Sequence, residues 1–315
     1  MDRFLSKLMP RMPKSMLYKG MRKNCVRLNG KHIKDGSVFI SEGDVLTLYF
    51  KDEFFEKRDT GFKYVKPELD IVYEDENILV VNKAVGVLVH ADDRGTAAAT
   101  LIDMIKSYLA ENGEYDPGDE NSFTPALCNR LDRNTGGLVI AAKNAPALRE
   151  MNKHIRNREV RKFYLAVVEG YPPEEGELRG YTERSGKVTS VSGERSDQSK
   201  EAWLEYRVIA KRNGYSLVEI ELHTGRTHQI RAQFSDAGYP LAGDTKYGAR
   251  GGGFRQALWS VRLVFDIGGD GRLGYLDGRS IEVKAPFEKS FNSADQGETN
   301  GVYFTGGNKK HRRKI

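Results

Sequence analysis

The sequence contains little of several residue types on which whole classes of protein depend. It has 2 cysteines in 315 residues, so neither a disulfide framework nor a multi-cysteine zinc site can be built from it. No apolar run approaches the about 18 residues that a membrane-spanning helix needs. We therefore expect neither a disulfide-rich domain nor a membrane partner, and a protein located in the reducing cytoplasm.

The excess of one charge sign is also small. Lys plus Arg number 50 against 44 Asp plus Glu, which gives a net charge of +6, while 39% hydrophobic residues suffice for a core. A mild excess affects partner choice only where it is clustered. It is clustered at the start, where Asp2 is the only acid in the first 34 residues. We expect these basic residues to contact phosphates rather than to form an ordinary solvated face: Lys14, Lys19, Arg22, Lys23, Arg27 and Lys31.

Residues 1–60 are expected to form a small α/β module. Phe4, Leu5 and Leu8 have helical spacing, which a folded first helix explains better than a transit peptide does. The patterns that follow predict a helix capped by Ser15, a hairpin turning at Asn29-Gly30, and a strand over 45–50. This order, with the motifs at 3–5, 26–30 and 42–46, resembles the small RNA-binding module named after ribosomal protein S-four. Residues 61–69 are expected to be a linker.

Residues 70–290 predict an α+β catalytic domain with a mixed, mainly antiparallel sheet and flanking helices. Helices are expected over 97–111 with Thr96 at the start, over 146–158, and from a cap at Thr227 to Gly238. Strands or hairpins are expected over 70–83, 160–170, 201–223 with a turn at Asn213-Gly214, and 279–286, with a loop or hairpin over 186–199. The remaining residues, 291–315, are expected to be a basic, disordered tail.

One stretch concentrates charged groups beside a buried strand. Residues 128–137 (Cys-Asn-Arg-Leu-Asp-Arg-Asn-Thr-Gly-Gly) place Asp132 between Arg130 and Arg133, and an apolar run follows at 138–142. Neighbouring positive charge favours the ionised form of a carboxylate. From spacing alone, a surface loop with salt bridges explains the stretch equally well.

This stretch resembles the catalytic motif of the RluA-type pseudouridine synthases, which reads His-Arg-Leu-Asp, Arg, any residue, Thr-Ser-Gly. Asn129 replaces the His, Gly136 the Ser, and Ala84 a proline of the family's Asn-Lys-Pro-x-Gly segment. Further family motifs match at 162–170 (Lys-x-Tyr-x-Ala and Gly), at 222–234 (Leu-His-Thr-Gly-Arg-Thr-His-Gln-Ile-Arg-Ala-Gln-Phe) and at 241–248 (Leu-Ala-Gly-Asp-Thr-Lys-Tyr-Gly).

The resemblance implies roles for particular residues. Asp132 would be the nucleophile, Tyr164 would stack on the target base, and Arg231 would pair with Asp132. A second set would bind substrate: Arg130, Arg133, Lys162, Arg226, His228 and Ile230. No cofactor and no metal is expected, because the spacing of His223, His228 and Cys128 fits no common metal site and the glycines at 180–186 do not form a phosphate loop.

The implied function is isomerisation of specific uridines to pseudouridine in structured RNA by a monomeric enzyme. The expected partner is large-subunit ribosomal RNA or a ribosomal assembly intermediate. Three alternatives stay open: a transfer-RNA pseudouridine synthase, a ribosome-associated RNA-binding protein with secondary or lost catalysis, and a glycoside hydrolase. A glycoside hydrolase usually needs two carboxylates flanking the bond, and this motif offers one.

Overall fold

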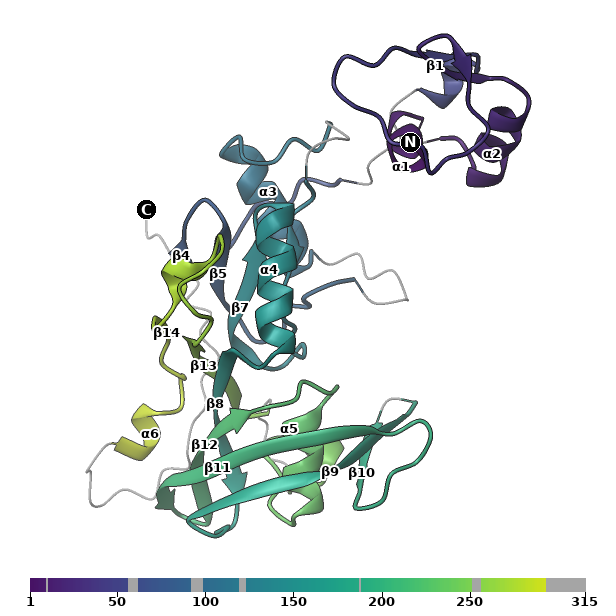
Figure 1. The fold of residues 1–315 in the computed structure, drawn as a ribbon. Coiled ribbons are helices and arrows are strands. Elements are labelled where there is room, and N and C mark those ends of the chain that lie inside the picture. Colours follow the sequence, from purple (N-terminus) through teal and green to yellow (C-terminus); the bar gives the residue numbers. More distant parts are fainter. Residues whose placement is uncertain are drawn as a thin grey trace, which may run out of the picture. The chain divides into compact units, whose positions relative to one another are not determined.

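The computed structural model describes residues 1–9, 11–55, 62–91, 99–118, 123–186, 188–250 and 256–292 (Figure 1). The chain forms two compact units, Met1–Tyr64 with Leu109–Thr124, and Val65–Tyr108 with Pro125–Ile315. Each is described by itself. Among the described residues, no helix is both long enough and apolar enough to cross a membrane. Most of the expected tail, 293–315, lies outside the described residues.

The first unit opens with two short helices. They are α1 (Asp2–Leu8), as expected, and α2 (Lys14–Arg22), and a 3-10 turn, η1, covers Asp52–Phe54. The predicted cap at Ser15 is wrong, because α2 begins at Lys14, with Pro13 at its N-cap, two residues earlier than predicted. Proline's fixed φ, here −60°, leads into a helix, and its missing N–H is one that a helix start does not use.

A three-stranded sheet completes this unit, in the order β2-β1-β3. β1 (Val26–Leu28) and β2 (Lys31–His32) form the predicted hairpin, with Asn29 at φ 49° and Gly30 at φ 77°. β3 (Leu46–Leu48) is shorter than expected. The Asn29 side chain donates to Asp44 Oδ1 (2.8 Å) and accepts from Val45 N (2.9 Å), which joins the hairpin turn to the segment before β3. Leu5, Met9, Leu17, Met21 and Val26 form a buried core.

The second unit is built on one mixed, mainly antiparallel sheet, which confirms the α+β prediction. The strand order is β10-β9-β11-β12-β8-β13-β7-β5-β4, with β14 on β13 and β6 on β7. Pairing is antiparallel except where β13 runs parallel to β7. The strands are β4 (Ile71–Glu74), β5 (Ile78–Lys83), β6 (Ala126–Leu127), β7 (Gly136–Ala142), β8 (Val160–Glu169), β9 (Glu175–Ser185), β10 (Val188–Ser192), β11 (Lys200–Arg212), β12 (Tyr215–Leu222), β13 (Leu258–Phe265) and β14 (Ser280–Glu282).

Helices pack beside this sheet: α4 (Ala145–Arg156) against β7, and α5 (Gln229–Asp236) beside β9 and β10 (Figure 1). Asn144 caps α4 by accepting from Ala147 N at 2.9 Å. The predicted cap of α5 at Thr227 is wrong, because His228 occupies that position in the left-handed region, at φ 54°. As predicted, Gly238, at φ 85°, follows the helix end. The remaining elements are η2 (Thr245–Tyr247), η3 (Gly274–Leu276) and α6 (Lys289–Asn292).

Helix α3 (Leu101–Glu111) starts later than predicted and runs from the second unit into the first. Residues 92–98, including the expected start at Thr96, lie outside the described residues. Thr100 and Asp103 instead bond each other's side chains and backbone amides, a capping box at the observed start. Gly113, at φ 73°, ends the segment as expected.

The strand that follows the Asp132 loop lies at the centre of the core. All seven residues of β7 are buried, and α4 covers a cluster that includes Leu138, Ile140 and Met151. Two glycines permit the close approach of β13: a Cβ at Gly136 would lie 2.3 Å from the Trp259 ring, and one at Gly137, which has φ 108°, would lie 2.1 Å from Ser260 O. The loop before β7 is therefore attached to a rigid base.

Candidate active site

Asp132 lies in a tight turn whose backbone is bonded to its surroundings. Thr135 N donates to Asp132 O at 3.1 Å. Asn129 extends the strand pairing through its side chain, since its Oδ1 accepts from Ile140 N (2.8 Å) and its Nδ2 donates to Leu138 O (3.3 Å). The carboxylate is thus presented from a constrained loop, as a reactive group requires.

A buried lysine holds this loop against the segment after β5. Lys83 Nζ donates to three carbonyls, Ala84 O (2.9 Å), Val87 O (3.0 Å) and Arg133 O (3.3 Å). Gly86 N also donates to Arg133 O, at 2.8 Å. Burial lowers the pKa of Lys83 to about 8, against the opposing effect of the Asp132 charge. Although Ala84 lacks the stiffness of proline, this ammonium group fixes the segment.

Arg231 on α5 bridges two carboxylates. Its Nη1 lies 3.0 Å from Asp132 Oδ2, the pairing that the resemblance implies, while its Nε and Nη2 lie 2.6 and 2.9 Å from the two oxygens of Asp244. Burial alone would lower the pKa of Arg231, but the hydrogen bonds and charge of Asp244, with those of Asp132, raise it. The guanidinium is therefore charged, and it is oriented by Asp244 on one side so that it meets Asp132 on the other.

His228 also faces Asp132. Its Nε2 lies 3.7 Å from Asp132 Oδ2, and its Nδ1 lies 2.8 Å from the Tyr247 hydroxyl. Burial lowers the pKa of His228, against the opposing effect of the Asp132 charge. The ring is therefore neutral near pH 7, and it lies between the Asp132 carboxylate and the Tyr247 hydroxyl.

Tyr164 lies on β8, two strands away from the Asp132 loop. It pairs with Ser260 on β13, which pairs in turn with Gly137 on β7. The side chain is buried, which raises the pKa of Tyr164 to about 12, and the Asp132 charge acts in the same direction. The hydroxyl therefore stays protonated at neutral pH.

The other expected substrate-binding residues do not all gather at Asp132. Arg130 and Arg133 are exposed, and Arg133 Nε donates to Gly86 O at 3.1 Å. Arg226 is exposed and donates to Glu201 O at 2.8 Å. Ile230 is buried, one helical turn before Phe234 on α5. Lys162 is half-buried, and burial together with the charge of Arg158 lowers its pKa.

Sequence reasoning assigned no role to Asp244, Tyr247 or Lys83, although it noted the segments that contain them. The signal was present in each case, since Asp244 and Tyr247 belong to the Gly-Asp-x-x-Tyr-Gly segment and Lys83 to the Asn-Lys segment. The sequence did not show that these residues contact partners far along the chain: Asp244 and Arg231 are 13 residues apart in sequence, and Lys83 and Arg133 are 50 apart.

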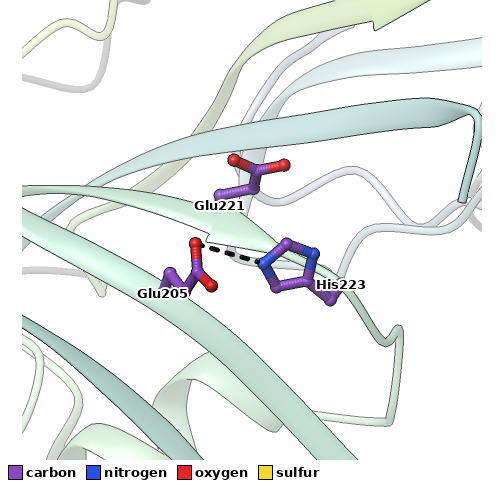
Figure 2. A group of neighbouring side chains, drawn as sticks. All are labelled: Glu205, Glu221 and His223. Atoms are coloured by element: carbon purple, nitrogen blue, oxygen red, sulfur yellow. Dashed lines mark ion pairs between the residues drawn. The ribbon is translucent and has the colours of Figure 1, made fainter. Parts of the chain in front are cut away.

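One group of side chains outside this site resembles a metal site. Glu205, Glu221 and His223 present ligand atoms within 4.8 Å of one another (Figure 2). Arg161, however, donates to both oxygens of Glu221, at 2.8 and 2.9 Å. The His223 ring stacks on Trp203, whose ring also lies under the Arg179 guanidinium. A cation would compete with Arg161 for Glu221 and lie among arginines, so we assign no metal to this group.

The arrangement around Asp132 suits nucleophilic chemistry. It offers one carboxylate paired with a guanidinium, a neutral imidazole, and a buried tyrosine two strands away. The chain belongs to the family described as RNA pseudouridylate synthase, whose model matches residues 77–236. It is therefore an RNA pseudouridine synthase, an intramolecular isomerase whose substrate is RNA.

Relatives agree with this assignment. One from Aquifex aeolicus, named an uncharacterized RNA pseudouridine synthase, is 31% identical over 83% of this chain and 80% of its own. Proteins from Neisseria meningitidis (29% identical, 84% of this chain and 71% of theirs) and Zymomonas mobilis (31%, 79% and 76%) are named ribosomal large subunit pseudouridine synthase D.

Solved structures resemble this chain in fold. The human RNA pseudouridylate synthase domain containing 1 protein matches with a TM-score of 0.55 and 23% identity, over 75% of this chain and 88% of that one. The human domain containing 4 protein matches with the same TM-score and 21% identity, over 69% and 88%.

Proposed function

We propose that this enzyme isomerises specific uridines in large-subunit ribosomal RNA, with Asp132 as the nucleophile. The observation that carries the assignment of the nucleophile is the ion pair between Asp132 and Arg231, because a desolvated carboxylate without a charged partner would take up a proton instead of attacking. The RNA class is supported by the names of the Neisseria meningitidis and Zymomonas mobilis relatives.

The reaction breaks the bond between N1 and the ribose C1′, turns the base, and joins C5 to C1′. C5 loses its hydrogen and N1 gains one, so atoms and electrons balance without a redox partner. Asp132 would add either to C1′ or to the base ring, and Arg231 would keep it charged once RNA excludes water. Tyr164 would stack on the base, a contact of about 1–3 kcal/mol that any base can make.

The target uridine must leave its helix before it can reach Asp132. Flipping a base out of the stack costs a few kcal/mol. Arg130 is exposed beside the nucleophile, and we propose that it fills the vacated space. Arg133 is exposed as well, with its Nε bonded to Gly86 O, and would contact the neighbouring phosphate backbone.

Residues 1–60 would act as an RNA-docking module like that named after ribosomal protein S-four. Lys14, Lys19, Arg22, Lys23 and Lys31 are exposed, and Arg27 lies over the ring of the exposed Tyr49, at 5.8 Å. Exposed cations contact phosphates and an exposed aromatic ring can stack on a base. Replacing Lys19, Arg22 and Lys23 by glutamine should flatten the plot of log affinity against log salt by about 0.7–0.9 per lost contact. An unchanged slope would remove the docking role.

Mapping pseudouridines in cellular RNA tests the proposal directly. Cells without the gene should lose pseudouridine at one or more large-subunit positions, and the wild-type gene, but not the Asp132→Asn gene, should restore them. Loss in transfer RNA only would favour the transfer-RNA alternative. Full restoration by Asp132→Asn would show that another group is the nucleophile.

A further inference from the structure

The hydrogen bonds around Tyr247 determine which nitrogen of His228 carries its proton. Thr189 N on β10 lies 2.9 Å from the Tyr247 hydroxyl oxygen, and a backbone N–H can only donate. In the described part of the chain, the only other hydrogen-bond partner of this hydroxyl is His228 Nδ1, at 2.8 Å. The hydroxyl hydrogen therefore goes to Nδ1, because the opposite tautomer would leave that hydrogen without an acceptor.

With Nδ1 accepting, the neutral ring carries its hydrogen on Nε2, the nitrogen that faces Asp132. We propose that Tyr247 and His228 are a positioning pair for the nucleophile: the Tyr247 hydroxyl fixes the Nε2–H tautomer, and the imidazole directs this N–H at Asp132. The inference rests on the proposed role of Asp132 as nucleophile. At 3.7 Å the N–H is too far from Asp132 Oδ2 for a hydrogen bond, and it acts on the carboxylate as an oriented dipole.

The backbone around both residues supports this role. His228 is a non-glycine residue at φ 54°, a strained conformation of the kind that concentrates at functional sites. Tyr247 is buried, and its carbonyl accepts from Ser235 Oγ on α5 at 2.6 Å. The Arg231 guanidinium lies over the Tyr247 ring, 4.8 Å from its centre. One tyrosine thus supports both partners of Asp132, His228 through its hydroxyl and Arg231 through its ring.

The charges near His228 determine what happens when the pH falls. The charged groups that act on it are Asp132, Asp244, Arg231 and Lys246. Burial lowers the pKa of His228, and a proton on Nδ1 would point at the hydroxyl hydrogen of Tyr247. In the wild type the His228 ring therefore stays uncharged as the pH falls into the acidic range. Without the Tyr247 hydroxyl, Nδ1 is free to take up a proton, and the pKa of His228 should rise.

Activity against pH separates this role from a purely structural one. Tyr247→Phe should lower kcat about 10-fold, the loss expected for one hydrogen bond, with KM for RNA unchanged. The acidic limb of its plot of kcat against pH should move to higher pH, because the pKa of His228 should rise without the hydroxyl. His228→Gln keeps an N–H donor near the position of Nε2 and cannot titrate, so its pH profile should show no contribution from this residue. Adding Tyr247→Phe to His228→Gln should cost nothing further, because the hydroxyl acts through the imidazole.

Tyr206→Phe is the matched control, since Tyr206 is a buried tyrosine on β11 that packs on Phe234 and lies outside the site. Its pH profile should match that of the wild type. If Tyr247→Phe also kept the wild-type profile and lost only melting temperature, the hydroxyl would be structural and the inference would be wrong.

Nitrogen NMR of histidine-labelled protein tests the tautomer without any reaction. The shifts of Nδ1 and Nε2 distinguish the two neutral forms, and comparison with the His228→Gln spectrum assigns the signal among the 6 histidines. We expect the Nε2–H form in the wild type and a mixture in Tyr247→Phe. An Nδ1–H form in the wild type would overturn the inference even if Asp132 is the nucleophile. Substantial activity of Asp132→Asn would instead overturn the proposed function, which this spectrum does not measure.

Discussion

Replacing Asp244 by asparagine should damage both stability and catalysis, although Asp244 does not face the substrate in the proposed mechanism. Asp244 is 3% exposed and makes two of the three hydrogen bonds that join Arg231 to carboxylates. Asparagine keeps the shape of the side chain, but it removes the charge and places an NH₂ group against the N–H groups of the guanidinium. The Arg231 side chain, which is 8% exposed, would then be paired with one carboxylate, that of Asp132, instead of two.

The size of the effect follows from the difference in burial between the two carboxylates. Removing one partner of a buried ion pair costs about 3–5 kcal/mol, because the other charge stays desolvated. The Asp132 side chain is 26% exposed and makes one hydrogen bond to Arg231, and Asp132→Asn leaves the pair with Asp244 intact. We therefore expect Asp244→Asn to lower the free energy of unfolding by about 3–5 kcal/mol and Asp132→Asn by about 1 kcal/mol or less.

Urea unfolding measures the first quantity, and release of tritium from RNA labelled at C5 of uridine measures catalysis. Asp132→Asn should abolish release. Asp244→Asn should reduce kcat about 100-fold, since a displacement near 1 Å has that effect, while RNA affinity changes little. Asp236→Asn, at the exposed end of α5, is the control and should stay within about 0.5 kcal/mol. Equal losses of stability for Asp132→Asn and Asp244→Asn would refute the idea that Asp244 holds Arg231 in place.

The other predictions concern the tyrosine and the two groups that fix the loop. Tyr164→Phe should bind RNA almost as well as the wild type, and Tyr164→Ala should bind it less well. Equal RNA binding of both variants in a filter assay, with equal rates of tritium release, would mean that Tyr164 only packs in the core. Gly137→Ala should lower the free energy of unfolding by about 1–3 kcal/mol, because alanine is strained at φ 108°, and the clash with Ser260 O should add to this loss. An unchanged free energy of unfolding in urea would contradict this prediction. Burial lowers the pKa of Lys83 from 10.5 to about 8, so between these pH values the unfolded chain binds more protons. Stability from this group should therefore rise with pH across that window, by up to about 3 kcal/mol, and Lys83→Met should remove the rise.

The sequence predicts the proposed reacting groups better than the residues that hold them in place. Asp132 and Arg231 lie in local motifs, and the family resemblance is sufficient to predict the pairing that the structure shows at 3.0 Å. Asp244, Tyr247 and Thr189 support the site through contacts between distant segments. Thr189 reaches Tyr247 from a hairpin strand 58 residues away. Neither periodicity nor turn signals encode such a contact, because each describes only a few neighbouring residues.

Elements without an apolar pattern also escape sequence-based prediction. β9 reads Glu-Gly-Glu-Leu-Arg-Gly-Tyr-Thr-Glu-Arg-Ser, with charged residues and glycines where a half-buried strand would show regular alternation. It forms because β11 pairs with it on one side and β10 on the other. The cap of α5 differs from its prediction for a similar reason. Thr227 is the better capping residue type, yet the site holds the chain at φ 54° one residue later, at His228.

The two departures from the catalytic motif are explained by packing around the loop rather than by a change of chemistry. Asn129, where the family has histidine, bonds the backbone of β7 at Leu138 and Ile140 through its amide, a role that requires a donor and an acceptor on one short side chain. Gly136, where the family has serine, lies under the Trp259 ring. Trp259 is in turn fixed by donating to Asn82 Oδ1 at 3.2 Å. A serine at position 136 would require the Trp259 ring to move, so Gly136 and Trp259 are suited to each other. Both departures from the motif therefore leave the backbone of the Asp132 loop fixed.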